Sequence, residues 1–209
     1  MPNAEVPGRD CTLCPRLKAF RDTNRAQYPD FFNGPVPSFG DPEARLLIVG
    51  LAPGLKGANK TGRPFTGDYA GDLLYATLAK HGLSRGVYAA RADDGLSLVG
   101  CRITNAVRCV PPQNKPVPIE ENTCRPFFER ELASLPLLET ILALGLVAHN
   151  QVLKALGLKR STYPFKHGAL HALPNRLSLA DSYHCSRYNT NTGVLTAEMF
   201  DEVVARIAR

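Results

Sequence analysis

Four cysteines are spaced in a way that favours a metal centre. Cys11 and Cys14 form a C-x2-C pair near the N-terminus, and Cys109 and Cys124 lie far downstream with 14 residues between them. Four thiolates can hold a zinc ion or an iron–sulfur cluster, and a cluster is well served by widely scattered ligands. Either centre would tie the N-terminal segment to the middle of the chain.

Other uses of these cysteines have weaker support. The total of six is even, which would allow disulfides, but the first 30 residues contain no apolar core of a signal peptide. Thiol–disulfide exchange at a C-x2-C pair normally follows a strand, and no strand is expected before Cys11. Cys101 and Cys185 lie in apolar, strand-like stretches, and we expect both to be small buried residues.

A long loop rich in glycine, over residues 50–68, follows the first expected strand. Gly54 precedes Lys60 and Thr61 at the distance found in a phosphate-binding P-loop. However, Asn59 stands where a P-loop needs glycine, at the most constrained position of its backbone. The mismatch argues against nucleotide hydrolysis.

Polar side chains also follow two later strands. Asn105 lies in Thr-Asn-Ala-Val-Arg-Cys, and its amide carries a donor and an acceptor that can read a base edge. His184 is followed by Ser186 and Arg187, a combination that offers a hydrogen bond to a leaving group and contacts to phosphate. Alone, Asn105 could cap a turn and His184 could be a satisfied buried histidine. Their presence together favours a functional site.

The elements that must position these residues alternate along the chain. Apolar runs predict strands at 45–50, 98–110, 140–144 and 177–183, and apolar periodicity predicts helices at 12–25, 69–81, 120–135, 146–156 and 196–208. This order indicates an α/β fold with a mostly parallel sheet covered on both faces. Functional loops are then expected at the carboxyl ends of the strands.

Charge and hydropathy limit the kinds of binding partner that the sequence predicts. The chain has 25 basic and 19 acidic residues, a net charge of +6, which is compatible with a polyanionic partner but does not establish one. No apolar run approaches the roughly 18 residues that a membrane span needs, so no membrane partner is expected.

Taken together, these residues resemble the uracil-DNA glycosylase superfamily, specifically its family 5, the B-type Fe–S enzymes. The resemblance covers nearly the whole chain, and the order and spacing of the motifs are more specific than any one motif. In chain order the motifs are Cys11-x2-Cys14, Gly50-Leu51-Ala52-Pro53-Gly54, Thr61 to Asp68, Asn105 to Cys109 with Pro111 and Pro112, Cys124, and His184 to Gly193.

The resemblance implies one three-layer α/β/α domain over residues 1–209, around a mostly parallel sheet. It also implies a monomeric, cytoplasmic, nucleoid-associated enzyme that excises uracil, and other deaminated bases such as hypoxanthine, from double-stranded DNA. Its ligands for a 4Fe–4S cluster would be Cys11, Cys14, Cys109 and Cys124. The substrate-binding residues would be Gly50, Ala52, Gly54, Phe65 and Asn105, the catalytic residues Asp68 and His184, and the DNA-binding residues Ser186, Arg187, Asn189 and Asn191.

The residues support this chemistry. Phe65 would stack on an extruded base, Asn105 would pair with the edge of uracil, and His184 would stabilise charge on the departing base. Leu51 and Ala52 stand where better-known families carry a polar residue that positions water, an absence that B-type enzymes share. Asp68 is the nearest carboxylate, although it could equally be the N-cap of the next helix.

Two functions of another class stay open from the sequence. The chain could be an Fe–S protein that recognises damaged DNA without cleaving it, or a cluster protein for electron transfer. Electron transfer does not require Phe65, Asn105 and His184 at three separate positions after strands. Only an assay of base excision distinguishes a glycosylase from a protein that binds damaged DNA without cleaving it.

Overall fold

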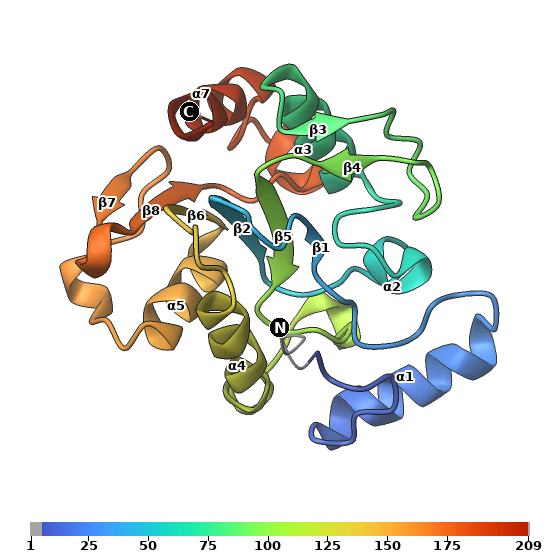
Figure 1. Cartoon of the computed structure of the whole chain (residues 1–209). Helices are drawn as coiled ribbons and strands as arrows, with labels where there is room; N and C mark the ends of the chain where they lie inside the picture. The colour runs from blue at the N-terminus through green and yellow to red at the C-terminus, as the bar shows by residue number, and fades with distance from the viewer. Residues whose placement is uncertain (1–5, 209) are drawn as a thin grey trace.

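The apolar run that ends at Gly50 lies in the middle of a mixed sheet (Figure 1). The computed structural model describes residues 6–208, so residues 1–5 and 209 of the expected domain lie outside the described residues. The strands of the main sheet, in chain order, are β1 (Phe39–Gly40), β2 (Leu46–Gly50), β5 (Cys101–Asn105), β6 (Thr140–Leu144), β7 (Leu170–Ala172) and β8 (Ser178–Ser182).

The spatial order of this sheet is β1-β5-β2-β6-β8-β7. The four inner strands are parallel, whereas β1 and β7 pair antiparallel at the two edges. A separate two-stranded ribbon joins β3 (Ser84–Arg85) to β4 (Ser97–Leu98). The helices are α1 (Pro15–Gln27), α2 (Ala58–Thr61), α3 (Tyr69–Lys80), α4 (Pro118–Ala133), α5 (Leu146–Ala155), α6 (Arg187–Asn191) and α7 (Ala197–Ile207).

Helices cover both faces of the sheet, as Figure 1 shows. Successive side chains of a strand point to opposite faces, so Leu46 and Ile48 pack with α3 and α7 while Leu47 and Val49 pack with α4 and α5. Burial on both faces explains why β2 and β6 read as nearly continuous apolar runs. The expected three-layer α/β/α fold is confirmed.

A third, smaller apolar cluster attaches α1 to the body. Leu17 of α1 packs with Val107 and Cys124, and Cys14 and Cys109 flank them. Cys14 of the C-x2-C pair therefore lies close to the downstream cysteines.

The prediction of one strand over residues 98–110 is wrong in its length. The structure divides this region into β4, a turn at Gly100 with φ of 61°, β5, and an irregular segment after Asn105. The amides of Ala106 and Val107 donate to the carbonyls of Gly50 and Leu51, at 2.9 Å each, and so attach the start of that segment to the end of β2. Val107 is buried in the third cluster and Cys109 packs against it, so the apolar pattern resembled that of a longer strand.

The other predicted helices and strands agree with the structure to within a few residues. Helix α1 begins at Pro15, three residues later than expected, and α4 begins at Pro118, two residues earlier. The edge strands, the β3–β4 ribbon and the short helices α2 and α6 were not predicted. Cys101 and Cys185 are completely buried, as expected. No helix in the described residues has the length and apolar character to cross a membrane.

Candidate active site

A cavity of about 570 Å³ opens where β2, β5 and β8 end. Parallel strands present their carboxyl ends at one edge of the sheet, so segments far apart in the chain meet there. The cavity is lined by Leu51, Ala52, Pro53, Gly54, Lys56, Ala58, Phe65, Asp68, Tyr69, Ala70, Asn105, Asn114, His184, Ser186 and Arg187. Most of the residues predicted for the site are therefore brought together.

Gly50 allows two of these side chains to lie against the end of β2. Its partner in the parallel register of β2 and β5 is Asn105. A Cβ on Gly50 would lie 2.4 Å from Asn105 Oδ1 and 2.7 Å from the Phe65 ring, so any larger residue would displace both side chains. Gly50 leaves the space that the Asn105 and Phe65 side chains occupy, but it does not itself line the cavity.

The amide of Asn105 is available for a ligand. The residue is 3% exposed, and in the described part of the chain its side chain has no hydrogen-bond partner. A buried amide normally satisfies its donor and its acceptor. Because the Asn105 amide lies on the cavity wall, the missing partners are expected to come from a bound molecule.

Phe65 and His184 approach each other across the cavity. Their ring centroids are 5.9 Å apart with an interplanar angle of 29°. Burial lowers the pKa of His184 below its usual 6.5, so the imidazole is neutral at pH 7. Within residues 6–208 the His184 ring has no hydrogen-bond partner, and a neutral imidazole offers one N–H donor.

Asp68 has a structural role that the sequence had left open. Its carboxylate accepts a hydrogen bond from Gly71 N at 3.3 Å and caps α3. Burial raises its pKa, against the lowering effect of the Gly71 and Ala70 amides. A Cβ on Gly57 would lie 2.1 Å from Asp68 Oδ2, so the carboxylate occupies space that this glycine leaves. The cap is confirmed, and the carboxylate also lines the cavity.

A short helix, α6, forms soon after His184, where the sequence predicted a loop after the strand at 177–183. Ser186 caps α6 by accepting from Asn189 N at 3.3 Å. The Asn189 amide donates to the carbonyl of His184 at 2.8 Å and so fixes the backbone that carries the imidazole. Asn191 is exposed and does not line the cavity. DNA contacts by Asn189 and Asn191 stay predictions.

Arg187 lies at the rim of the cavity with its guanidinium 5.4 Å from the centre of the Tyr69 ring, in cation–π geometry. Sequence reasoning missed Tyr69, Lys56 and Asn114 as lining residues. Asn114 has a φ of 56°, and its place after Pro111-Pro112 in a turn was the only signal. Lys56 was visible within the glycine-rich loop, but nothing in the pattern showed that it faces the cavity.

The four cysteines of the expected cluster line a second, small cavity of about 20 Å³ beside α1 and α4. Burial, with repulsion from Cys124, raises the pKa of Cys14 to about 11, and the same two causes raise that of Cys109 to about 12. Cys11 and Cys124 complete the set, and none of the six cysteines, all within the described residues, forms a disulfide. A bound cation would favour the ionised form of Cys14 and Cys109.

The sulfurs are further apart than a single zinc ion would hold them. Among residues 6–208, no three cysteine sulfurs lie within 4.8 Å of one another. Zinc–sulfur bonds of about 2.3 Å would place tetrahedral thiolates about 3.8 Å apart. The donor set therefore fits a larger centre better than one zinc ion.

Another group of ligand-type side chains is satisfied internally. His149 bonds Asp181 at 2.7 Å and the Tyr163 carbonyl at 2.9 Å, and His171 bonds Asp181 at 3.1 Å. None of them lines the large cavity. These bonds hold the segment before β7 onto β8, and we assign the group a structural role.

Comparison with known proteins agrees with this geometry. A family model described as the uracil DNA glycosylase superfamily matches residues 37–208. The type-5 uracil-DNA glycosylase of Thermus thermophilus is 48% identical over 204 residues, which cover 95% of this chain and 93% of that protein. The type-5 enzyme of Pyrobaculum aerophilum is 40% identical, covering 95% and 88%, and that of Mycobacterium bovis is 40% identical, covering 92% and 75%. The chain belongs to the uracil DNA glycosylase superfamily and, within it, to the type-5 group.

Proposed function

We propose that this protein excises uracil from DNA by hydrolysing the bond between the base and C1′ of the sugar. The observation that carries the proposal is the unpartnered Asn105 amide, which lies in one cavity with the Phe65 ring and the neutral His184 imidazole. The relatives named as type-5 uracil-DNA glycosylases support the same activity. A base inside a duplex must leave the stack before it can enter such a cavity.

Recognition would depend on the amide and the ring. The Asn105 Nδ2 donates to O4 of uracil and its Oδ1 accepts from N3–H, so both groups gain the partners that they lack. Phe65 stacks on the face of the base, an interaction worth about 1–3 kcal/mol in comparable sites. Because every base has a face to stack on, the amide and not the ring would distinguish uracil.

Bond cleavage would leave charge on both fragments. The electron pair of the C1′–N1 bond departs with the base, so the sugar becomes cation-like and negative charge develops on uracil O2. His184 donates its N–H to that oxygen, where a fixed donor stabilises the transition state more than the substrate. A neutral imidazole serves here because it adds no positive charge beside the cationic sugar.

Asp68 would act on the other fragment. Its carboxylate faces the cationic sugar and, in its ionised form, accepts the proton of the attacking water as the water oxygen bonds to C1′. That proton finally neutralises the departed uracil anion. Leu51 and Ala52 cannot take this part, because neither carries a titratable group.

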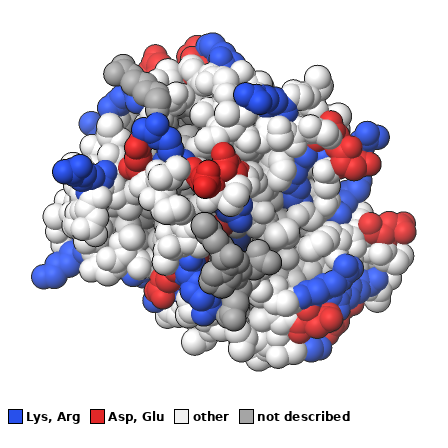
Figure 2. All heavy atoms as spheres, viewed as in Figure 1, with Lys and Arg blue, Asp and Glu red and all other residues white. Residues whose placement is uncertain are grey.

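The accepted bases extend beyond uracil in this proposal. Ala52 occupies the cavity wall with a single methyl group, which leaves space for larger deaminated bases such as hypoxanthine. Double-stranded DNA would approach the rim of the cavity, which carries Ser186, Arg187 and Lys56. Asn189 and Asn191 lie on α6, the short helix that begins at Arg187. On the face in Figure 2 basic and acidic residues are interspersed.

We further propose that Cys11, Cys14, Cys109 and Cys124 hold a 4Fe–4S cluster. Their number, the cavity that all four line and the separation of their sulfurs support a cluster. The cluster would supply the positive charge that favours ionised thiols at these four positions. The cysteines themselves connect α1, the segment after Asn105 and α4, and so brace the wall of the active site through Val107 and Ala52.

A single-turnover assay on a uracil-containing duplex tests this function. The expected products are free uracil and an abasic site, with one uracil released per site. A protein that bound uracil-containing DNA tightly but released no base would support damage recognition without cleavage instead.

A further inference from the structure

Phe65 is held in a backbone conformation that it would not adopt alone. Its φ is 51°, in the left-handed region that residues other than glycine rarely occupy. Bulky residues persist there only when their surroundings fix them. The neighbouring interactions must therefore favour this conformation strongly enough to keep the ring in the cavity.

Hydroxyl groups bind the carbonyls around Phe65. Thr61 Oγ1 donates to the carbonyls of residues 63 and 66, at 3.3 and 3.0 Å, as alternative acceptors. Tyr75 donates to the Pro64 carbonyl at 2.8 Å, and Tyr88 lies 3.4 Å from the Phe65 carbonyl. The orientation of these two tyrosines consequently determines the path of the segment.

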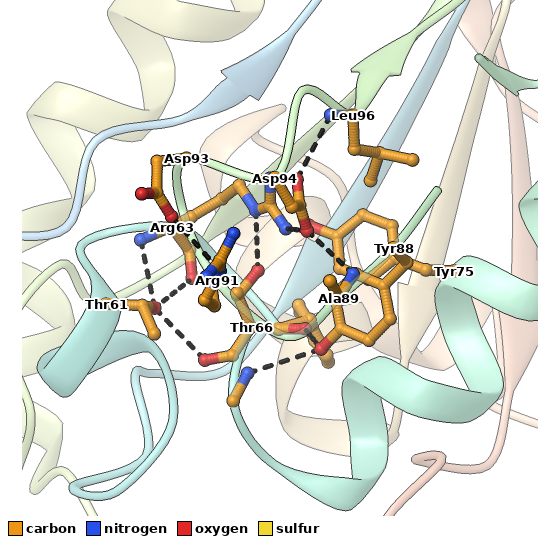
Figure 3. A network of polar contacts seen from close by, with 12 residues as sticks. Thr61, Arg63, Thr66, Tyr75, Tyr88, Ala89, Arg91, Asp93, Asp94 and Leu96 are labelled. Carbon is orange, nitrogen blue, oxygen red and sulfur yellow. Dashed lines mark hydrogen bonds and ion pairs between the residues drawn. The ribbon is translucent and has the colours of Figure 1, made fainter. Parts of the chain in front are cut away.

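Arg63 connects these groups, as Figure 3 shows. Its side chain is 4% exposed and makes two 2.7 Å hydrogen bonds to Asp94, while its Nε donates to Thr66 Oγ1 at 2.8 Å. The guanidinium also lies over the rings of Tyr75 and Tyr88, 5.5 and 5.7 Å from their centroids. One planar cation thus contacts both tyrosines and the loop itself.

Asp94 anchors this arrangement from the other side. Its side chain is 1% exposed, although the residues around it are largely at the surface. It accepts from the backbone amides of Ala89 and Leu96, at 2.9 and 3.0 Å, in addition to Arg63. Those two amide bonds fix the Asp94 carboxylate independently of Arg63. The carboxylate can therefore hold the guanidinium in a fixed position.

We propose that Arg63 is a positioning residue, held by Asp94, that keeps the Phe65 ring in place for stacking on the extruded base. Arg63 does not line the cavity, so it affects the base only through Phe65. Lysine cannot replace it, because one ammonium neither makes the paired bonds to a carboxylate nor stacks flat on aromatic rings. The inference rests on the proposed function, since it assigns a stacking role to Phe65.

A double-mutant cycle tests the coupling. Single-turnover kinetics on uracil-containing duplex are compared for the parent, Arg63→Lys, Phe65→Ala and the double variant. We expect Arg63→Lys to raise the half-saturating protein concentration about tenfold, no more than the loss of the whole stack, and to leave the maximal rate within about twofold. In the Phe65→Ala background the same change should have an effect below about twofold.

Arg102→Lys is the matched control, because Arg102 makes a similar ion pair with Glu131 away from the cavity. It should reduce thermal stability without changing half-saturation. If the Arg63 and Phe65 effects multiply in full, Arg63 does not act through Phe65 and the inference is wrong. Should Arg63→Lys fail to fold, Asp94→Asn enters the same cycle and is judged by the same criterion.

Amide hydrogen exchange separates this inference from the proposed function, since it needs no DNA. Exchange of the backbone amides of residues 65–68 should quicken in Arg63→Lys and stay unchanged in Arg102→Lys. Unchanged exchange in both variants would overturn the positioning role even if uracil is released. Absence of uracil release by the parent, with faster exchange in Arg63→Lys, would instead overturn the proposed function.

Discussion

His184 is a hydrogen-bond donor whose protonation state is set by its burial. We predict that His184→Ala slows single-turnover excision by about 10²–10³-fold, with little change in DNA affinity, because the donor acts mainly in the transition state. The pKa of the imidazole lies below 6.5, so the imidazole is predominantly neutral between pH 6.5 and pH 8. The ratio of parent to variant rates should then be constant over this range. A ratio that changes near pH 7 or above would contradict a neutral donor.

The same shift has a consequence for stability. A depressed histidine pKa means that the unfolded chain binds the proton more readily than the folded protein. Below pH 6.5 the parent should therefore lose stability faster than His184→Ala, and above it the two should keep a constant difference.

Asp68 combines a helix cap with a carboxylate in the cavity. We predict that Asp68→Asn reduces the excision rate and leaves the melting temperature at pH 7 unchanged or higher. The folded-state pKa of Asp68 is raised above its unfolded value of 3.8, so the charge opposes folding at neutral pH. Asparagine removes that charge and still caps the helix.

Thr196→Ala is the control for this variant, since Thr196 caps α7 by accepting from Met199 N at 3.2 Å. Loss of that cap should lower the melting temperature by about 2–4 °C and leave the rate unchanged. If Asp68→Asn behaved like Thr196→Ala, the carboxylate would be structural only.

At the scale of elements, the sequence predicted the inner sheet better than its surroundings. β2 is an uninterrupted apolar run and β6 is nearly one, because helices cover both faces, whereas β5 and β8 also contain polar residues such as Arg102 and Asp181. The edge strands β1 and β7 have only two and three residues, too few to show alternation. Helix α6 was missed because Arg-Tyr-Asn-Thr-Asn has no apolar periodicity, although Ser186 is a suitable cap.

The site was predicted where its residues come directly after strands. Asn105 ends β5, and Gly50 ends β2, so their proximity follows from the order of parallel strands. Lys56, Tyr69 and Asn114 reach the cavity from loops and the start of a helix, whose paths depend on tertiary contacts. The role of Asn189 in holding the His184 carbonyl was likewise hidden, because it required the turn of α6.

Helix α6 gives Arg187 a defined position at the rim. We predict that Arg187→Ala weakens binding to uracil-containing and undamaged duplexes alike, and reduces the slope of log affinity against log salt by about 1. Titrations of both duplexes at several salt concentrations measure it. The control is Arg160→Ala, which removes the same charge from an exposed residue outside the cavity. An effect confined to uracil discrimination would place Arg187 elsewhere.

For the whole molecule, the cysteines connect distant parts of the chain. We predict that anaerobically purified protein is brown, with broad absorbance near about 400 nm and four irons per chain in its 4Fe–4S cluster. Cys109→Ser should lose iron and thermal stability, because Cys109 joins the segment after β5 to α1 and α4. Cys185→Ser, at a buried cysteine outside this group, should keep its iron. A colourless protein with one zinc per chain would contradict the cluster.

The central claim is that one cavity, organised around the Asn105 amide, recognises uracil and releases it. The most direct test is single-turnover release of free uracil by the parent, Asn105→Ala and Asn191→Ala. The last is a matched control, because Asn191 is exposed and lies outside the cavity. The parent and Asn191→Ala should release uracil at rates within about threefold, whereas Asn105→Ala should be slower by at least about tenfold, the loss of one or two hydrogen bonds to the base. Release by Asn105→Ala at the parental rate, or none by the parent itself, would contradict the account.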